Sequence, residues 1–223
     1  ANCYQDVRGL FGGAAKHLIV PAARVVKLDQ SFKDRGVLIA LAATAYHAIA
    51  GEGATIPELI IGHGIVGRLI ARIAVALGND APLVWEKNAT RRNGALGYSV
   101  VDPTEDPRRD YHAICDASGD ASLLDTLIGR LAKRGEITLA GFYETPLSFT
   151  FPPAFMREAR MRIAAEWARA DIDAVMDLIT SGKLSLEGLV TNHSTPHHAP
   201  EAYKTAFTDP TCLKMILDWR DAA

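Results

Sequence analysis

Three glycines with the spacing of a phosphate-binding turn are the strongest chemical signal in the chain. Gly62, Gly64 and Gly67 form a G-x-G-x-x-G pattern between the apolar run 59–61 and the apolar stretch 65–77. The first glycine permits a tight turn, the second lets the backbone approach a pyrophosphate, and the third lets a helix pack closely on the sheet. Unpaired amides at the helix start can then hold phosphates. The spacing therefore predicts a dinucleotide site, and a glycine turn in an unrelated α/β fold is the alternative.

An acidic residue follows at the position that such a site requires. Glu86 lies 24 residues after Gly62, at the end of the apolar run 82–85. A carboxylate there accepts hydrogen bonds from the ribose hydroxyls of NAD and repels the 2′-phosphate of NADP. Lys87, Arg91 and Arg92 follow closely and can in principle accept a 2′-phosphate, although a solvated helix start explains them as well. We therefore expect NAD rather than NADP.

Short apolar runs alternate with helical patterns along most of the chain, and these elements must position the turn. Continuous apolar strands that alternate with helices are typical of a parallel sheet covered on both faces. The pattern predicts an α/β fold with a Rossmann-type, doubly wound parallel sheet. The expected strands are 59–61, 82–85, 99–101, 113–115, 137–140 and 161–164, and the expected helices are 34–51 (with Asp34 as N-cap), 65–77, 123–133, 171–179 and 200–207. Short β elements are expected in the first 30 residues, including 17–20 and 25–28.

Composition narrows the function further. The 223 residues carry a formal net charge of -2, which gives no electrostatic footprint for nucleic acid or an anionic membrane. The longest stretch without Asp, Glu, Lys or Arg is 16 residues, from Gly36 to Gly51, which is short for a spanning helix. Three widely spaced cysteines fit a reducing compartment, so we expect a cytoplasmic protein. The chain starts at Ala1 without a methionine, and we expect that an N-terminal part of the natural protein is missing.

The chain resembles the medium-chain dehydrogenase/reductase superfamily over nearly its whole length. Besides the glycine turn, the matching pieces are 12–15 with 20–22, 41–46, 116–119, 135–141, 181–184, 202–203 and 214–219. Within that superfamily, segments 6–16, 155–167 and 206–223 resemble the bacteriochlorophyllide dehydrogenase family of photosynthetic bacteria. The resemblance implies NAD-dependent oxidation of a 3-(1-hydroxyethyl) group on a chlorin to acetyl. It also implies a GroES-like remnant at 1–33, a Rossmann domain at 34–150, and the end of that domain with a return to the first at 151–223.

The resemblance also assigns cofactor-binding positions, residue by residue. The phosphate turn is matched by Gly62, Gly64, Ile65, Val66 and Gly67, the ribose acid by Glu86, and the adenosine rim by Lys87 and Arg91. Ala117 and Ser118 match the loop under the adenosine ribose, Gly141 and Phe142 match a strand end near the nicotinamide, and Lys214 matches a basic residue that reaches the pyrophosphate. Lys214 as an exposed strand lysine is the alternative.

Three residues are candidates for the proton transfer that alcohol oxidation needs. Thr44 matches a threonine beneath the nicotinamide ring, with a helix residue bonded to its own backbone as the alternative. His47 and His63 lie on segments expected to face the nicotinamide, and a nearby phosphate favours a cationic His63; local packing of His63 is the alternative. Zinc alcohol dehydrogenases carry a cysteine where this chain has Ala40, so we expect no metal.

A chlorin substrate would need a broad apolar surface and a cation for its carboxylate. Phe149, Phe151, Phe155 and Met156 can supply the surface and Arg157, Arg160 or Arg162 the cation, although ordinary core aromatics and surface arginines explain them equally. The alternative functions are another zinc-independent medium-chain alcohol dehydrogenase or quinone or enoyl reductase, a non-catalytic NAD-binding protein, and a methyltransferase. Superfamily members are commonly dimers or tetramers, so the resemblance implies a homo-oligomer.

Overall fold

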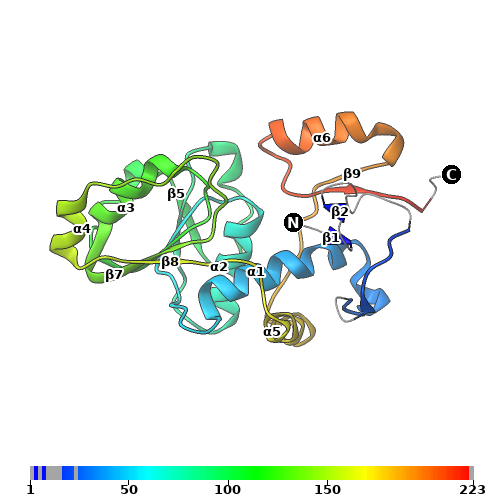
Figure 1. Cartoon of the computed structure of the whole chain (residues 1–223), viewed down its shortest axis with the longest axis horizontal. Coiled ribbons are helices and arrows are strands. Elements are labelled where there is room, and N and C mark those ends of the chain that lie inside the picture. Colours follow the sequence, from blue (N-terminus) through cyan, green and yellow to red (C-terminus); the bar gives the residue numbers. More distant parts are fainter. Residues whose placement is uncertain (1–2, 5–6, 9–16, 23–24, 221–223) are drawn as a thin grey trace. The chain divides into compact units, whose positions relative to one another are not determined.

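The computed structural model of the chain describes residues 3–4, 7–8, 17–22 and 25–220 (Figure 1). It contains two compact units: unit 1 is Ala1–Gly36 with Val190–Ala223, and unit 2 is Val37–Leu189. The quoted motif at 12–15 lies outside the described residues. The domain boundaries expected at 33/34 and 150/151 stay predictions.

Unit 2 is built on a six-stranded parallel sheet with the order β5-β4-β3-β6-β7-β8. Its strands are β3 (Leu59–Ile61), β4 (Leu83–Trp85), β5 (Ser99–Val101), β6 (Tyr111–Asp116), β7 (Leu131–Leu139) and β8 (Arg160–Ile163). Chain order and sheet order change direction between β3 and β6, which makes the carboxyl ends of these two strands a topological switch point. The predicted doubly wound α/β fold is confirmed.

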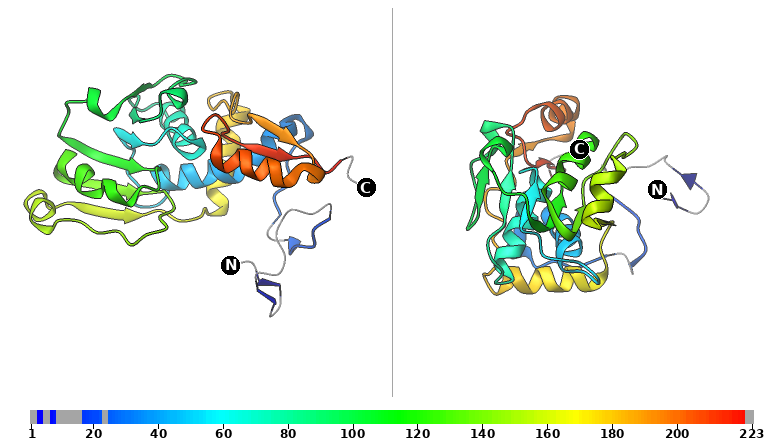
Figure 2. Two further views of the ribbon diagram at one scale, coloured as in Figure 1. Left: turned by 90° about the horizontal axis from the view of Figure 1, so that it is seen from above. Right: turned by 90° about the vertical axis from the view of Figure 1, so that its left-hand side faces the viewer.

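Helices cover both faces of this sheet, as its alternating side chains require. The helices of unit 2 are α1 (Ile39–Ala50), α2 (Ile65–Ala76), α3 (Leu124–Arg130), α4 (Phe151–Arg157) and α5 (Arg169–Thr180), with 3-10 turns η3 (Ala89–Arg91), η4 (Pro103–Glu105) and η5 (Ala121–Leu123). Ile60 faces α2, whereas Leu59 and Ile61 pack with Leu127 of α3 in the core. Helix α1 packs against α2 and α5. Figure 2 shows unit 2 from two further sides.

Unit 1 contains short elements. Strands β1 (Cys3–Tyr4) and β2 (Val7–Arg8) pair antiparallel, and β9 (Asn192–Ser194) pairs in parallel with β10 (Met215–Leu217). Helix α6 (Ala199–Thr208) packs against β9 and β10, and the 3-10 segments are η2 (Gln30–Leu38), which extends to the start of α1, and η6 (Pro196–His198).

Two sequence-based helix boundaries and two expected β elements are wrong. The helix expected from Asp34 begins as the 3-10 segment η2 at Gln30, because Asp29 accepts the Ser31 amide (2.8 Å), and α1 starts only at Ile39. The helix expected to run to residue 133 ends at Arg130, because Leu131 adopts an extended conformation and pairs with Tyr111. The expected β elements at 17–20 and 25–28 are not strands.

Candidate nucleotide-binding site

A pocket of about 440 Å³ opens at the carboxyl ends of β3, β4 and β6, where the switch point of the sheet lies. Such crevices are where doubly wound sheets bind their ligands. The pocket is lined by Ile61, Gly62, Gly64, Trp85, Glu86, Lys87, Arg91, Pro103, Ala117, Ser118, Asp120, Leu123 and Thr126. Seven of these residues were predicted from the sequence to bind a dinucleotide: Gly62, Gly64, Glu86, Lys87, Arg91, Ala117 and Ser118.

The glycine turn has a separate geometric reason for each glycine. Gly62 has φ +92° and a Cβ on it would lie 3.2 Å from the Cα of Ser118. A Cβ on Gly67 would lie 1.9 Å from the carbonyl oxygen of Gly62, so α2 can cross the turn this closely only with glycine there. A Cβ on Gly64 would meet nothing within 4 Å, because this residue faces the pocket. The turn therefore leaves open space where a phosphate would approach.

Backbone amides at the start of α2 are available to an anion. Within the described part of the chain, the amides of Gly64, Ile65 and Val66 have no hydrogen-bond acceptor. The first turn of α2 carries no acidic residue, so no side chain competes for these donors. The partial positive charge of the helix start adds to their attraction for a phosphate. This end of α2 fits a diphosphate.

Glu86 faces the mouth of the same turn. It follows β4 directly, and its amide donates to the carbonyl of Val101 (3.0 Å). Its Oε2 accepts the backbone N–H of His63 (3.0 Å), and its Oε1 accepts that of Asn88 (2.8 Å). An ionised carboxylate accepts more than two hydrogen bonds, so both oxygens keep capacity for ribose hydroxyls. These two hydrogen bonds hold the Glu86 carboxylate beside the glycine turn.

The loop after β6 is shaped by Asp116, which the sequence reasoning quoted only as part of a motif. Asp116 is buried, and its Oδ1 accepts both the amide (2.9 Å) and the hydroxyl (2.6 Å) of Ser118. Its Oδ2 accepts the hydroxyl of Tyr143 (2.8 Å), and burial together with this carboxylate raises the pKa of Tyr143. A buried acid at the end of an apolar strand is the signal that could have identified this residue.

Gly141 and Phe142 lie beside that loop rather than among the pocket-lining residues. The amide of Gly141 donates to the carbonyl of Asp116 (2.9 Å), and a Cβ on Gly141 would lie 2.7 Å from the Gly119 nitrogen. The Phe142 side chain is exposed. The close approach to Gly119 explains why residue 141 is a glycine. A role of Gly141 or Phe142 near a nicotinamide stays a prediction.

The basic residues around the pocket differ in how they are held. Arg92 donates to the carbonyls of Glu86 (2.8 Å) and Lys87 (2.9 Å) and pairs with Asp102. Lys87 is exposed and forms an ion pair with Asp120 (3.8 Å). The Arg92 guanidinium is therefore committed to the protein, which weakens the case that it accepts a 2′-phosphate.

Thr44 and His47 lie on α1 and do not line this pocket. The hydroxyl of Thr44 donates to the carbonyl of Ala40 one turn earlier (3.1 Å), as the alternative interpretation expected. The Nδ1 of His47 lies 2.8 Å from Oδ2 of Asp171, whose carboxylate also accepts the amide of Ala168 at the start of α5 (2.6 Å). His47 thus ties α1 to α5, and catalytic roles for both residues stay predictions.

His63 lies inside the glycine turn with a fully buried ring. Its Nδ1 is 2.6 Å from the carbonyl oxygen of Arg91, and its Nε2 is 2.8 Å from the hydroxyl of Tyr98. A carbonyl only accepts, so Nδ1 donates to Arg91. Arg72 donates to the Tyr98 hydroxyl, which leaves the hydroxyl proton for Nε2 of a neutral imidazole. Burial is the main cause that lowers the pKa of His63 to about 4. Burial and the lowered pKa disfavour the cationic ring that the sequence suggested, and the hydrogen bonds agree with local packing.

The depressed pKa of His63 predicts a loss of stability in mild acid. The unfolded chain protonates this histidine as the pH falls below 6.5, whereas the folded chain resists protonation down to about 4. Arg68, Arg72, Tyr98 and Glu86 face the His63 ring. The positive charges of Arg68 and Arg72 oppose protonation of the ring. We expect the free energy of unfolding to fall by about 2 kcal/mol more in the wild type than in His63→Asn between pH 7 and pH 5.

Denaturant titrations at both pH values measure this difference. The exposed His112 supplies the matched control, because His112→Ala should keep the full pH dependence. Equal pH dependence in the wild type and His63→Asn would show that the ring is not held neutral.

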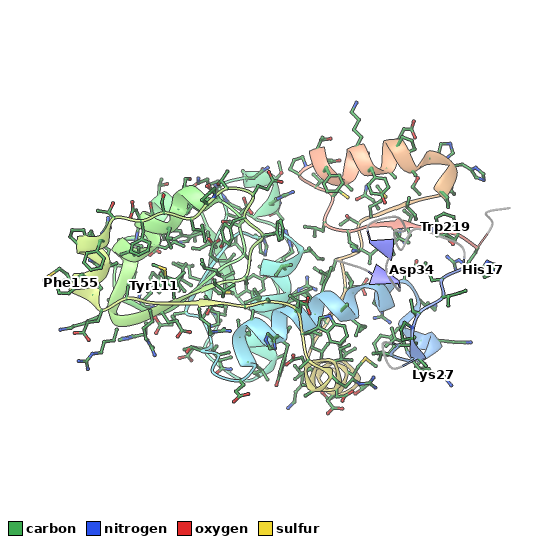
Figure 3. All side chains as sticks on the ribbon, viewed as in Figure 1. His17, Lys27, Asp34, Tyr111, Phe155 and Trp219 are labelled. Carbon is green, nitrogen blue, oxygen red and sulfur yellow. The ribbon has the colours of Figure 1, made fainter. Side chains whose placement is uncertain are left out.

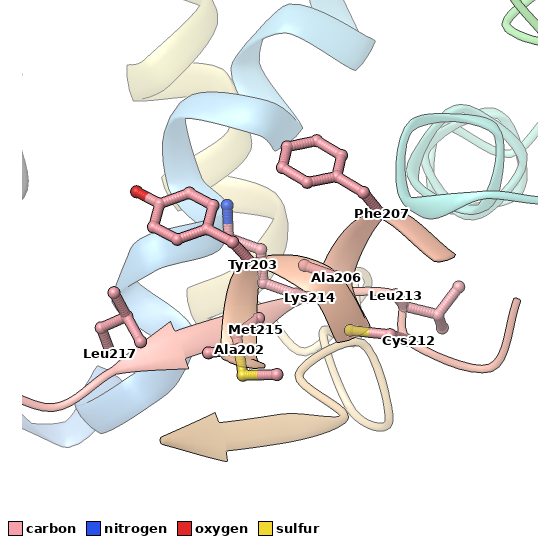
Figure 4. A pocket seen from close by; sticks show the side chains of 9 residues that line it. All are labelled: Ala202, Tyr203, Ala206, Phe207, Cys212, Leu213, Lys214, Met215 and Leu217. Atoms are coloured by element: carbon pink, nitrogen blue, oxygen red, sulfur yellow. The ribbon is translucent and has the colours of Figure 1, made fainter. Parts of the chain in front are cut away.

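Lys214 belongs to unit 1, where it lines a second pocket of about 220 Å³ (Figure 4). The other lining residues are Ala202, Tyr203, Ala206, Phe207, Cys212, Leu213, Met215 and Leu217. Tyr203 and Phe207 stack with ring centroids 6.3 Å apart. The contact between Lys214 and a pyrophosphate stays a prediction.

The residues expected to form a chlorin surface gather on α4 and the preceding segment. Phe149, Phe151, Phe155 and Met156 are exposed and line a shallow pocket of about 750 Å³; Figure 3 shows Phe155 at the edge of unit 2. The proposed cations are engaged elsewhere, since Arg157 donates to the carbonyl of Leu131 (3.1 Å) and Arg162 to that of Ala48. An apolar surface is present here. The bonds of Arg157 and Arg162 to backbone carbonyls favour the alternative that these residues have a structural role.

No three His, Cys, Asp or Glu side chains are arranged to hold a metal within the described ranges. None of the helices described here is both long and apolar enough to cross a membrane.

The amino-acid sequence is closely similar to two curated proteins. It is 58% identical over 223 residues to the 2-desacetyl-2-hydroxyethyl bacteriochlorophyllide A dehydrogenase of Rhodobacter capsulatus, covering 100% of this chain and 71% of that protein. It is 55% identical to the protein of the same name from Cereibacter sphaeroides, of which it covers 72%. No protein-family model matches the chain.

Solved structures share the fold at low sequence identity. A dehydrogenase (rspB) from Escherichia coli, complexed with the cofactor NADH, matches 89% of this chain with a TM-score of 0.77 and 20% identity. The 2R,3R-butanediol dehydrogenase of Bacillus subtilis matches 81% of it with a TM-score of 0.70 and 18% identity. The chain spans 63% and 56% of these two proteins.

Proposed function

The chain belongs to the 2-desacetyl-2-hydroxyethyl bacteriochlorophyllide A dehydrogenase family of the medium-chain dehydrogenase/reductase superfamily, and from this membership we propose its reaction. It oxidises the 3-(1-hydroxyethyl) group of a bacteriochlorophyllide to acetyl, a step of bacteriochlorophyll a biosynthesis, with NAD as hydride acceptor. The observation that carries the proposal is the 58% identity across the whole chain with the Rhodobacter capsulatus protein. The pocket at the switch point supplies independent physical support.

The residues of the pocket fit an NAD molecule. When bound, this cofactor accepts the hydride that leaves the alcohol carbon. The amides of Gly64, Ile65 and Val66 would hold its diphosphate, and Gly62 and Gly67 would let the backbone come close enough. Such a cradle requires α2 to cross the turn closely, and a Cβ added at Gly67 would lie only 1.9 Å from the Gly62 carbonyl oxygen.

Glu86 favours NAD over NADP. Its carboxylate is fixed by the amides of His63 and Asn88 at the mouth of the turn, where the adenosine ribose would lie. The ribose hydroxyls donate to it, whereas a 2′-phosphate would place a second anion beside it. Arg92, one of the three basic residues that could neutralise that anion, is paired with Asp102, and Lys87 is paired with Asp120. Lys87 and Arg91 line the outer rim of the same pocket.

The proton of the alcohol needs an acceptor on the protein or in its solvent. Oxidation would break the C–H and O–H bonds of the secondary alcohol and form its C=O bond, and the proton would go to that acceptor while the bound cofactor would take the hydride. Thr44 and His47 remain the proposed participants on this chain. A zinc-independent reaction is proposed because Ala40 stands where zinc alcohol dehydrogenases carry a cysteine.

A chlorin substrate, a cytoplasmic location and a homo-oligomeric state complete the proposal. The exposed apolar surface around Phe151 and Phe155 is available to a planar macrocycle. The buried cysteines Cys115 and Cys212 are free thiols, which suits a reducing compartment.

An assay of the purified full-length protein tests the proposed reaction. With hydroxyethyl bacteriochlorophyllide and NAD, we expect the acetyl product and one NADH per molecule converted, followed by the absorbance of both chromophores. Metal chelation should leave the rate unchanged, and NADP should support a lower kcat/KM than NAD. Absence of turnover on this substrate, or equal turnover with NADP, would contradict the corresponding part of the proposal.

A further inference from the structure

A buried polar network lies directly beneath the phosphate turn. The His63 ring contacts the Arg91 carbonyl through Nδ1 (2.6 Å) and the Tyr98 hydroxyl through Nε2 (2.8 Å). The rings of His63 and Tyr98 meet edge-on with centroids 5.6 Å apart, and both are buried. One residue of the turn therefore contacts both the middle and the end of the segment between β4 and β5.

Two buried arginines of α2 grip the same segment. Arg68 donates through Nε to the carbonyl of His63 (3.0 Å) and through Nη2 to that of Arg91 (2.8 Å). Arg72 reaches the carbonyl of Gly94 (3.4 Å) and interacts with Tyr98. Apart from η3, segment 87–98 has no helix or strand, so these contacts are what holds it on α2.

The segment carries part of the cofactor pocket. Lys87 and Arg91 line that pocket, and the amide of Asn88 fixes one oxygen of Glu86. The backbone amide of His63 fixes the other oxygen. His63 thus connects the phosphate turn, the ribose carboxylate and the adenosine rim through three separate hydrogen bonds.

We infer that His63 and Tyr98 are positioning residues of the cofactor site, which clamp segment 87–98 onto the phosphate turn so that Glu86 is in place before the cofactor binds. The inference rests on the proposed function of this site. A preformed site loses less conformational freedom on binding, so the clamp contributes to cofactor affinity and to the choice of NAD over NADP. Chemistry at the substrate is left to other residues.

The test is a set of substitutions compared by NADH and NADPH binding in calorimetry, without chlorin substrate. Tyr98→Phe removes one hydroxyl and leaves His63 Nε2 without a donor, so the Kd for NADH should rise roughly tenfold. His63→Phe removes both ring bonds and should raise it roughly hundredfold while the NADH preference over NADPH narrows. His63→Asn keeps an N–H near the Arg91 carbonyl and should recover part of the affinity. At saturating NAD, kcat should stay within about twofold for Tyr98→Phe.

A matched variant outside both pockets serves as the control. His112→Ala removes an exposed imidazole on β6 and should leave the two Kd values unchanged. A clamp that only stabilises the fold would lower the unfolding temperature of Tyr98→Phe without moving the NADH to NADPH ratio, which overturns the inference. If His63→Phe instead lowers kcat and leaves the Kd for NADH unchanged, His63 is a proton acceptor and the inference is overturned. If wild-type protein binds NADH and the variants bind equally well, the inference alone fails; if wild type binds none, the proposed function fails with it.

Discussion

Gly67→Ala should lose cofactor binding almost completely and destabilise unit 2. An alanine Cβ would lie 1.9 Å from the Gly62 carbonyl oxygen and 3.0 Å from its carbon. Both are backbone atoms of the turn itself, so neither can move aside as the tip of a flexible side chain could. The turn must open or α2 must slide, and strain of this kind costs about 3 kcal/mol. A shift of about 1 Å in the phosphate-binding amides should weaken NADH binding roughly hundredfold.

Calorimetric binding of NADH and denaturant unfolding measure the two effects, and two other glycines supply the controls. Gly129 lies in α3 with open space around it, so Gly129→Ala should change neither NADH affinity nor activity and should add about 0.5 kcal/mol of stability. Gly64→Ala also has open space and an allowed φ, but its Cβ would project toward the pocket, so it should weaken binding without weakening the fold. Normal NADH affinity in Gly67→Ala would show that the close crossing is not needed for binding.

The glycine turn and the sheet were predictable because they rest on local signals. The run 59–61, the glycine spacing and the helical pattern 65–77 are adjacent in sequence, and the structure has β3, the turn and α2 at nearly the same bounds. Glu86 was also predictable, since the end of a strand next to the turn must lie at the same edge of the sheet. Its contact with the His63 amide follows from that topology.

The role of His63 could not be predicted from local sequence signals. Its type suggested a proton carrier, but the direction of its ring depends on Tyr98 and Arg91, which lie in a segment without regular periodicity. The burial of Arg68 and Arg72, whose guanidinium groups bond to that segment, could not be read from charge patterning, which assigns arginines to the surface. Asp116 was missed for a related reason, because its partner Tyr143 lies 27 residues away in an irregular loop.

Glu86→Gln should weaken NAD binding by roughly 10- to 100-fold and reduce the preference for NAD over NADP by more than about tenfold, because charge-assisted hydrogen bonds to the ribose are lost. The glutamine side chain has nearly the same size, but one of its ends is an NH2 group. Since the amides of His63 and Asn88 both donate to the native carboxylate, that NH2 must face an N–H or turn away. The loss of the negative charge removes the repulsion of a 2′-phosphate, so NADP binding should fall less than NAD binding.

Initial rates with each cofactor at saturating chlorin give the two kcat/KM values. The exposed carboxylate of Glu105, changed to glutamine, is the control that should alter neither value. Unchanged discrimination in Glu86→Gln would mean that another part of the pocket selects the cofactor, and it would remove the physical basis for assigning NAD to this chain.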